Sequence, residues 1–481
     1  MRTYKILSLS VVILLITVVF AGVVPAAAQY DTMQFRYSAQ HTGDYSPVAG
    51  PVPSNGQLKW SYTITGYVTS SPAVANGVAY VGSTDGNVYA LNATTGTKLW
   101  NYTTGGTVES SPAVANGVVY VGSGIYGSNG NVTAINATTG AKVWNYATGS
   151  EVYSSPAVVN GVVYVGCTYP DCNVYALNAT TGAKLWNYTT GARSVYSSPA
   201  VANGIVYVGS EDGNLYALNA TTGAKLWNYT AGNPVFSSPA VANGVVYVGC
   251  DNRNVYALNA TTGANLWSYT TGGNVESSPA VANGVVYVGS NDNNLYALNA
   301  TTGANLWSYT PVGSSPAVAN GVVYVGSNDN NLYALNATTG AKVWNYTTGG
   351  SVYSSPAVAN GVVYVGSQDH NLYALGTTPT TLTATASATS VAVNQKFTVS
   401  GTLKTTNAPV TPVTGQPVYL EASYNAVTWF RISANKNTSS TGAYLFTGYI
   451  SQSGTYYLRA HFDGTTTYGA SMSTPTTVTV S

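Results

Sequence analysis

The chain has 481 residues, of which only 6% are charged, and its formal net charge is +1. Soluble domains carry roughly 25% charged residues, and a nucleic-acid binder needs a basic surface that displaces counterions from phosphates, so the composition argues against a nucleic-acid partner. Apolar residues make up 45% of the chain, with 51 Gly and 40 Tyr, and so much apolar surface argues against a disordered chain.

The N-terminus has the order of an export signal. Arg2 and Lys5 precede an apolar run from Ile6 to Val24, and small residues follow at Ala26–Ala28. This order predicts a signal peptide over residues 1–28 and an extracellular or cell-surface location. The apolar run approaches the length of a membrane span, so a retained N-terminal anchor is the alternative.

One phrase, written "SSPAVANGVVYVGS" at Ser277–Ser290, is repeated eight times with small changes. The tryptophans that accompany it are separated by 40, 44, 42, 41, 40, 40 and 37 residues: Trp60, Trp100, Trp144, Trp186, Trp227, Trp267, Trp307 and Trp344. A period of this length is typical of a four-stranded propeller blade. We therefore expect a propeller over residues 57–376, preceded by a lead-in segment over residues 29–56.

Turn residues divide each repeat into four strands. An Asn-Gly pair such as Asn283-Gly284 is a two-residue hairpin signal. The run "VVYVG" that follows is continuously apolar, as in a strand covered on both faces. A turn with Asp and Asn, the run "LYALN", the turn "NATTG" and the Trp-bearing strand complete the unit.

The ends of the array predict how the ring closes. The strand of Trp60 comes before the first repeat, and the eighth repeat stops at Leu375 with no Trp strand after it. One outer strand at the start and three inner strands at the end together make an eighth blade, which removes the unpaired edges of an open array. The predicted fold is all-β: an eight-bladed β-propeller closed by an N-terminal strand that completes the last blade, followed by an Ig-like β-sandwich.

The junction "ALNATTGTKLW" (Ala90–Trp100) resembles the tryptophan-docking motif of pyrroloquinoline-quinone-type propellers. That family includes quinoprotein alcohol dehydrogenases and bacterial outer-membrane-assembly scaffolds. "FRYSAQHTGDYSP" (Phe35–Pro47) is similar to the lead-in of such repeats. The resemblance implies that the tryptophans pack between blades as structural groups. This chain departs from the motif in having Asn where the family usually has Asp.

Catalysis by a quinoprotein, as the resemblance implies it, needs a cation held by oxygen ligands, a catalytic carboxylate and a cofactor pocket, all unique in the ring. The repeats here are nearly identical and contain no pair of adjacent cysteines. The carboxylates of the repeats are mostly hairpin residues explained by turn chemistry, with a weak cation site as the alternative: Asp85, Asp171, Asp212, Asp251, Asp292, Asp329 and Asp369. His41, His370 and His461 are scattered over different segments. We expect no catalytic, metal-binding or cofactor-binding residues, and no cofactor; pyrroloquinoline quinone and calcium belong to the alternative of a quinoprotein oxidoreductase.

One position varies among the otherwise copied phrases. It lies immediately before "SSP", at the start of the innermost strand and on the face of the Asp-bearing turns. Its aromatic and acidic members form the candidate binding face: Glu109, Tyr153, Tyr196, Phe236, Glu276 and Tyr353. Aromatic side chains flanked by carboxylates can stack on sugars or hold a peptide, and sequence drift at a solvent-facing position is the alternative.

Two kinds of covalent modification are open. Cys167 and Cys172 flank a Pro-Asp turn and could pair in an oxidising compartment, whereas Cys250 replaces a Ser of the repeat. Sequons for N-glycosylation occur at 13 positions: Asn92, Asn101, Asn131, Asn136, Asn178, Asn187, Asn219, Asn228, Asn259, Asn299, Asn336, Asn345 and Asn437. The alternative is that the sequons are not glycosylated and are numerous only because the turn residues are repeated.

The period stops after the eighth repeat, and residues 377–481 read as short alternating strands. They predict an immunoglobulin-like sandwich whose core would be built by Trp429 and the Tyr-rich strands. "SGTYYLRAHFDGTTTYGAS" resembles bacterial and archaeal surface modules of this kind, which implies a spacer or adhesive unit. The predicted function is a non-catalytic scaffold at the cell surface or secreted, binding protein or glycan; a quinoprotein oxidoreductase and a cell-envelope assembly scaffold are the alternatives.

Overall fold

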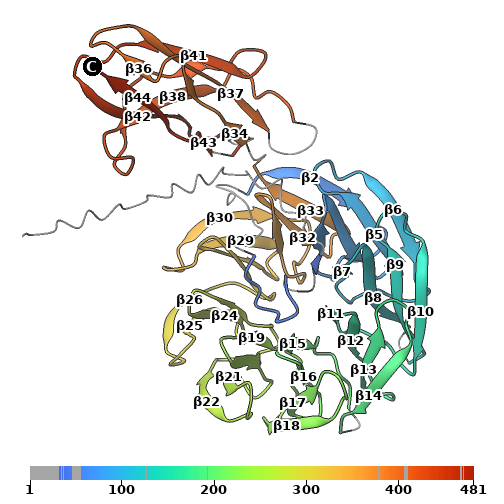
Figure 1. Cartoon of the computed structure of the whole chain (residues 1–481). Helices are drawn as coiled ribbons and strands as arrows, with labels where there is room; N and C mark the ends of the chain where they lie inside the picture. Colours follow the sequence, from blue (N-terminus) through green and yellow to red (C-terminus); the bar gives the residue numbers. More distant parts are fainter. Residues whose placement is uncertain are drawn as a thin grey trace, which may run out of the picture.

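The computed structural model describes residues 32–33, 35, 37–45, 56–125, 127–191, 193–377, 380–405, 410–465, 468–469 and 471–481. Their strands form a ring of radial sheets and a separate two-sheet sandwich (Figure 1), so the predicted all-β propeller followed by a β-sandwich is confirmed. In the described residues no helix is long and apolar enough to cross a membrane. The predicted signal segment, residues 1–28, lies outside them.

Each blade is an antiparallel sheet whose first strand is innermost and whose last strand is outermost. Blades 1 to 4 consist of β3 (Ala73–Ala75), β4 (Val78–Gly82), β5 (Asn87–Asn92) and β6 (Lys98–Thr103); β7 (Ala113–Ala115), β8 (Val118–Gly124), β9 (Gly130–Asn136) and β10 (Lys142–Thr148); β11 (Ala157–Val159), β12 (Val162–Gly166), β13 (Asn173–Asn178) and β14 (Lys184–Thr189); β15 (Ala200–Ala202), β16 (Ile205–Gly209), β17 (Asn214–Asn219) and β18 (Lys225–Thr230).

Blades 5 to 7 repeat this order, and blade 8 takes its outer strand from the other end of the array. They consist of β19 (Ala240–Ala242), β20 (Val245–Gly249), β21 (Asn254–Asn259) and β22 (Asn265–Thr270); β23 (Ala280–Ala282), β24 (Val285–Gly289), β25 (Leu295–Asn299) and β26 (Asn305–Tyr309); β27 (Ala317–Ala319), β28 (Val322–Gly326), β29 (Asn331–Asn336) and β30 (Lys342–Thr347); β31 (Ala357–Ala359), β32 (Val362–Gly366), β33 (Asn371–Gly376) and β2 (Leu58–Thr63). In blade 8, Trp60 lies opposite Ala374, which is the predicted closure.

Because neighbouring strands are antiparallel, the loops of a blade alternate between the two faces of the ring. One face carries the loops that precede the innermost strands and the turns between second and third strands; we call it the acidic face, for a reason given below. The opposite face carries the Asn-Gly turns and the Asn-Ala-Thr-Thr-Gly turns, and we call it the turn face.

Tryptophan docking joins each blade to the next. The indole Nε1 of seven tryptophans donates to an Ala carbonyl of the next blade at 2.8–3.2 Å, and a Tyr hydroxyl of the donor's own sheet donates to the same carbonyl at 2.9–3.3 Å. Trp60 and Tyr364 share Ala93 in this way. The predicted structural role of the tryptophans therefore has a geometric basis in the hydrogen bonds and in ring packing.

The "SSP" serines hold the centre of the ring. The second Ser of seven repeats donates its backbone N–H to the hydroxyl of the next at 2.8–3.0 Å: Ser71, Ser111, Ser155, Ser198, Ser238 and Ser278 in turn, and Ser355 back to Ser71. The first Ser accepts a backbone N–H from the Gly that ends the second strand of its blade, as Ser70 does from Gly82. These serines are structural hydrogen-bonding groups.

The predicted lead-in runs along the innermost strands. β1 (Thr32–Met33) pairs with β7, and the carbonyls of Ala39, Gln40, Thr42 and Gly43 accept the N–H groups of one Val in each of blades 4 to 7 at 2.6–2.8 Å. Figure 1 shows this dark blue segment inside the ring. Successive lead-in residues thus satisfy the inward edges of successive blades, which would otherwise be exposed in the channel.

The C-terminal residues form two packed sheets. One contains β34 (Thr380–Leu382), β35 (Thr385–Ala386), β37 (Phe397–Thr405) and β41 (Ala443–Gly448); the other contains β36 (Ser390–Val391), β38 (Pro417–Ser423), β39 (Phe430–Arg431), β40 (Lys436–Asn437), β42 (Gly454–Phe462), β43 (Ser471–Met472) and β44 (Thr476–Val480). Leu, Val, Phe and Tyr side chains fill the space between them. The immunoglobulin-like assignment stays a prediction.

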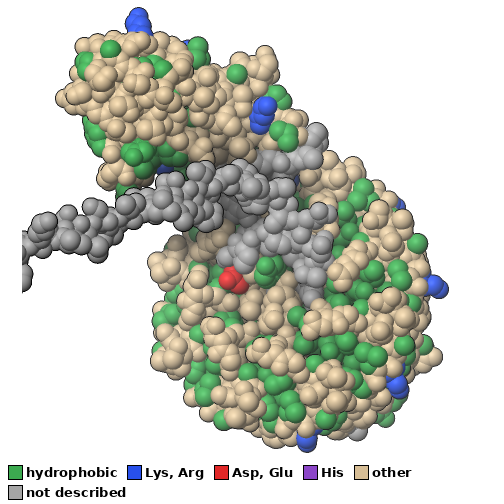
Figure 2. Space-filling view, viewed as in Figure 1, with side chains coloured by type: hydrophobic (Ala, Val, Ile, Leu, Met, Phe, Trp, Pro, Cys, Tyr) green, Lys and Arg blue, Asp and Glu red, His purple; other side chains and the backbone are tan. Residues whose placement is uncertain are grey.

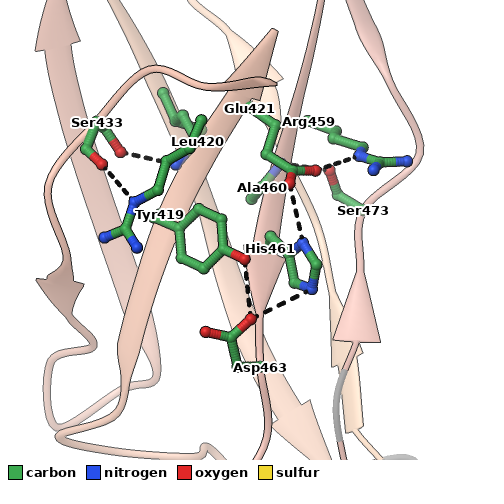
Figure 3. A network of polar contacts seen from close by, with 10 residues as sticks. Tyr419, Leu420, Glu421, Ser433, Arg459, Ala460, His461, Asp463 and Ser473 are labelled. Atoms are coloured by element: carbon green, nitrogen blue, oxygen red, sulfur yellow. Dashed lines mark hydrogen bonds and ion pairs between the residues drawn. The ribbon is translucent and has the colours of Figure 1, made fainter. Parts of the chain in front are cut away.

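The expectation that Trp429 belongs to this core is wrong. Trp429 is half-buried on the outer surface, where the guanidinium of Arg459 lies 4.0 Å from its ring centroid. Figure 3 shows the surrounding network: Glu421 accepts from Arg459 at 2.7 Å and lies 3.3 Å from His461. The contact with the Arg459 guanidinium stabilises the indole at the surface. The ion pairs of Glu421 with Arg459 and His461 join β38 to β42.

Docking predicts a specific cost at the ring's closing seam. A Cβ on Gly96 would lie 2.6 Å from the indole of Trp60, whereas a Cβ on Gly77 would meet nothing within 4 Å; both residues have positive φ, +73° and +76°. Gly96→Ala should therefore lose about 1–3 kcal/mol more stability than Gly77→Ala. Urea unfolding followed by Trp fluorescence measures both, and equal losses would contradict the docking role.

Candidate functional site

The variable position before "SSP" places side chains around the channel mouth on the acidic face. Tyr153, Tyr196 and Phe236 come from blades 3, 4 and 5. The rings of Tyr153 and Tyr196 stack, with centroids 5.9 Å apart and planes at 16°, and Tyr196 meets Phe236 edge-on at 5.6 Å. Tyr196 is 37% exposed. Three blades therefore contribute one continuous aromatic ladder, which Glu109 and Glu276 flank in ring order.

The carboxylates of the blades are confined to one face of the ring, where two arginines, Arg193 and Arg253, also stand. All acidic residues of the blades stand in loops of the acidic face: Glu109, Glu151, Glu211, Glu276, Asp85, Asp171, Asp212, Asp251, Asp292, Asp329 and Asp369. The lysines of the propeller stand in the first two residues of outer strands, at their turn-face ends: Lys59, Lys98, Lys142, Lys184, Lys225 and Lys342. Figure 2 shows basic side chains spaced around the outer edge of the ring. The acidic face is therefore the negative side of a polarised disc.

A polar pocket of about 470 Å³ lies on the acidic face in blades 6 to 8, which follow the ladder in ring order. Glu276 and Tyr353 of the candidate face line it, together with Asn291 and Asn328. Gly313 occupies the variable position of blade 7 and also lines the pocket. A Cβ there would lie 3.0 Å from the Asn328 side chain, so the absence of a side chain helps to keep the pocket open.

Asp251, on the same face, lies within range of the charge of Glu276. Burial and the charge of Glu276 raise the pKa of Asp251 to about 6, and one Asp251 oxygen is buried without a hydrogen-bond partner among the described residues. Glu276 accepts a hydrogen bond from Asn291 at 2.8 Å. On the other side of the ladder, desolvation raises the pKa of Glu109. Carboxylates therefore stand on both sides of the ladder in ring order, and Glu109 and Glu276 are both exposed.

The hairpin aspartates have structural partners. Asp292 accepts from its own turn at Asn294, from the hydroxyl of Tyr296 at 2.6 Å and from the N–H of Gly272 in the preceding loop. Burial raises the pKa of Asp292, but these hydrogen bonds outweigh it and hold the pKa below its ordinary value. Oxygens that already accept protein donors are poor cation ligands, which supports the turn interpretation over the cation alternative.

Asp251 lies in the turn between β20 and β21, as expected, but it does not make the hydrogen bond to the following Tyr that the other hairpin aspartates make. In blade 5 the place is taken by Asn252, whose side chain contacts the hydroxyl of Tyr256 at 2.7 Å and accepts from the N–H of Asn254. Asp251 stands one residue earlier, within range of the charge of Glu276. The hairpin side chain of a repeat is the one that bonds to the Tyr four residues later, and in the "DN" of blade 5 it is the Asn.

The suggested disulfide is absent. Cys167, Cys172 and Cys250 are buried free thiols. Burial and the nearby Asp171 raise the pKa of both Cys167 and Cys172. Cys172 occupies the left-handed position of the turn, with φ 54°, and its N–H donates to the carbonyl of Thr168. Turn geometry thus sets the positions of the two thiols.

Sequence reasoning missed part of this face. Tyr67 and His370 stack at 4.9 Å between blades 1 and 8. The polar residue one before each hairpin Asp, such as Asn291 and Asn328, also lines the face. This position varies among repeats in the same way as the position before "SSP", so comparing the repeats column by column would have found it.

The three histidines of the sequence lie in three different parts of the chain. No group of three or more His, Cys, Asp or Glu side chains within the described ranges could hold a metal ion. His41 is in the lead-in, His370 in blade 8 and His461 in the sandwich. Lead-in backbone also lies along the innermost strands of blades 4 to 7, in the central space where a ring can have singular groups.

A family model described as outer membrane protein assembly factor BamB matches residues 46–195, 99–235, 236–314 and 308–434. The chain belongs to this BamB family. Its repeats carry the pyrroloquinoline-quinone-type propeller pattern, as the resemblance of the Trp junctions implied. No curated protein matches the chain.

Solved structures agree with the BamB family at the level of fold. BamB from Moraxella catarrhalis is 21% identical, with 67% of this chain and 99% of that chain covered and a TM-score of 0.58. Quinohemoprotein alcohol dehydrogenase ADHIIG from Pseudomonas putida HK5 is 17% identical over 72% and 80%, at 0.61. The computationally designed Ika8 protein is 17% identical over 68% and 99%, at 0.58. These likenesses show the propeller fold.

The carboxylate pair predicts a pH-dependent stability. Because the folded-state pKa of Asp251 is raised to about 6 from 3.8, the stabilisation from its proton is complete below pH 3.8 and is lost as pH rises through about 6. Asp251→Asn cannot ionise and should match the wild type near pH 3.5 but exceed it near pH 7, by up to ~1 kcal/mol after solvent screening.

Urea midpoints measured across this range test the pair. Glu276→Gln is the control, because removing its charge should move the transition of Asp251 to lower pH. A stability difference that stays constant with pH would contradict the assigned titration.

Proposed function

We propose that this protein is a non-catalytic scaffold, secreted or displayed at the cell surface, whose acidic face binds a protein or a glycan. The observation that carries the proposal is the ladder of Tyr153, Tyr196 and Phe236. Copied repeats would place the same side chain in each blade, yet three successive blades carry aromatic rings in mutual contact at a position that varies elsewhere in the ring.

The surroundings of the ladder suit a ligand with an extended surface. Aromatic rings supply flat apolar area for a sugar ring or an apolar side chain. The pocket in blades 6 to 8 supplies amide and carboxylate groups from Asn291, Asn328 and Glu276, and a small number of convergent polar groups beside apolar area is typical of binding sites. The negative potential of this face favours a partner with positive charge at its contact surface.

The remainder of the chain suits an exported protein. The N-terminal signal pattern would carry it across a membrane, and the C-terminal β-sandwich would act as a spacer or adhesive unit. Membership of the BamB family supports protein–protein interaction in general, and assembly of the cell envelope is a narrower form of the same proposal.

Substitution within the ladder tests the proposed face. The wild-type protein is applied to a printed array of glycans and cell-wall fragments and to an array of surface-protein peptides, and the strongest probe is then titrated. Tyr196→Ala should lower affinity for that probe at least tenfold, about 1.4 kcal/mol, because Tyr196 contacts both ladder neighbours. Tyr449→Ala is the control, since Tyr449 is 62% exposed on the sandwich. Equal affinities for both variants would reject this face.

The quinoprotein alternative rests on the fold shared with alcohol dehydrogenases. The purified protein is incubated with pyrroloquinoline quinone and calcium, separated from free cofactor, and assayed for alcohol-dependent dye reduction. We expect neither a bound chromophore nor dye reduction, because the described residues offer no converging metal ligands. Both together would overturn the scaffold proposal.

A further inference from the structure

The sequons of the propeller fall into two structural classes. Seven have the sequence Asn-Ala-Thr and form the turn between third and fourth strands on the turn face: Asn92, Asn136, Asn178, Asn219, Asn259, Asn299 and Asn336. The side-chain oxygen of each accepts the N–H groups two and three residues later at 2.9–3.0 Å. The conformation of the turn thus uses the amide oxygen and leaves the amide nitrogen available.

The turn sequons also present their hydroxyl residue. Thr94, two residues after Asn92, is exposed, and its equivalents in the other six turns are exposed as well. Asn92 donates no side-chain hydrogen bond within the described part of the chain. The intervening Ala93 is buried, and its carbonyl accepts from Trp60 and Tyr364. Each turn is therefore fixed to the neighbouring blade by its middle residue, with both reactive groups of the sequon toward solvent.

The Asn-Tyr-Thr sequons of the outer strands differ in both respects. The side-chain nitrogens of Asn101, Asn187, Asn228 and Asn345 donate across the sheet to an Asn of the third strand at 3.0–3.4 Å. The sequon Thr donates its hydroxyl to the same acceptor at 2.7 Å, as Thr103 does to Asn87. In these sequons the amide nitrogen and the hydroxyl both donate hydrogen bonds to the neighbouring strand.

One further sequon of the propeller lacks an accessible hydroxyl. Thr133, which belongs to the sequon of Asn131, is 2% exposed and donates to Asn145 at 2.9 Å. Burial and hydrogen bonding remove it from the set that an enzyme can read in the folded protein. In the sequon of Asn437, which lies in the sandwich, the hydroxyl residue Ser439 is exposed and shares a hydrogen bond with Thr441 at 2.9 Å, so this sequon stands outside the comparison made within the propeller.

We propose that the seven Asn-Ala-Thr turns are N-glycan acceptors of the folded protein and that the Asn-Tyr-Thr sequons of the outer propeller strands, here called the strand sequons, are not. The co-reactant is a lipid-diphosphate-linked oligosaccharide. The side-chain nitrogen of the turn Asn forms a bond to the anomeric carbon of the first sugar, the bond from that carbon to the diphosphate oxygen breaks, the nitrogen loses one proton and the lipid diphosphate leaves. The proposal rests on the exported location proposed above, because such donors act on proteins crossing a membrane.

This placement would separate the two faces of the ring by function. The turn closes with a hydrogen bond from the N–H of Asn92 to the carbonyl of Thr97, and the outer strand then has a bulge at Leu99, which is 51% exposed. Glycans on the turn face would lie beside this residue and its equivalents. They would hydrate a surface with few charges. The aromatic ladder on the opposite face carries no turn sequon and would stay open to its partner.

The test compares the folded and the urea-unfolded full-length chain as acceptors. Each is incubated with a purified oligosaccharyltransferase and its lipid-linked oligosaccharide, in a buffer where an Asn-Ala-Thr peptide is glycosylated, and occupancy is read by peptide mass spectrometry. Turn sequons of the folded chain should be occupied at least tenfold more than strand sequons, and unfolding should abolish this preference. Equal occupancy in the folded chain, or no modification of folded protein when the unfolded chain is modified, would overturn the proposal.

A matched pair of variants assigns the sites. Thr94→Ala removes an exposed turn hydroxyl and should reduce the intact mass of the fully modified folded protein by one glycan. Thr103→Ala removes a strand hydroxyl, also exposed, and should leave the glycan number unchanged. The reverse result would overturn the proposal. Because the reaction uses purified components, its failure is independent of ligand binding by the acidic face and of the protein's location in the cell.

Discussion

The ring depends on one contact repeated at its seams: a tryptophan packed on a glycine of the next blade, with its indole N–H bound to the adjoining alanine carbonyl. A carbonyl accepts two donors, and here the second is the tyrosine of the same donor blade. This contact sets the angle between blades because the indole is large, flat and oriented by its hydrogen bond. The second serines of the "SSP" phrases link neighbouring blades by hydrogen bonds at the centre of the ring. Each blade is therefore joined to its neighbours both at its outer strand and at its innermost strand.

Because the same residues make the contacts between blades in every repeat, few positions can vary without lowering the stability of the ring. The residue before "SSP" and the residue before the hairpin Asp are two such positions, because both project from loops of the acidic face. Diversity at these positions is therefore compatible with the docking contacts. The aromatic ladder, the Asp251 and Glu276 pair and the pocket above Gly313 all arise there.

The turn face follows a different rule. Its Asn-Ala-Thr-Thr-Gly turns are fixed in sequence because alanine supplies the docking carbonyl and glycine accommodates the indole. The asparagine oxygen closes the turn, and the nitrogen is the one group of that side chain left over. Tryptophan docking therefore repeats a turn Asn with an available amide nitrogen around the ring. In the outer strands, by contrast, the sequon Asn donates its amide to an Asn of the third strand.

The sequence by itself determined the fold class, the number of blades and the closure of the ring, because the spacing of the tryptophans and the unequal ends of the array are properties of the chain order. It also predicted which positions vary on the acidic face. Only the tertiary structure decided that Tyr153, Tyr196 and Phe236 form a ladder, that the charge of Glu276 acts on Asp251 and that Trp429 lies outside the core, because these interactions join residues far apart in the sequence. It likewise decided that Cys167 and Cys172 are free thiols and which sequons have an available amide. The physical reason is that periodicity specifies pairing within a repeat, whereas contacts between repeats depend on side-chain direction and burial.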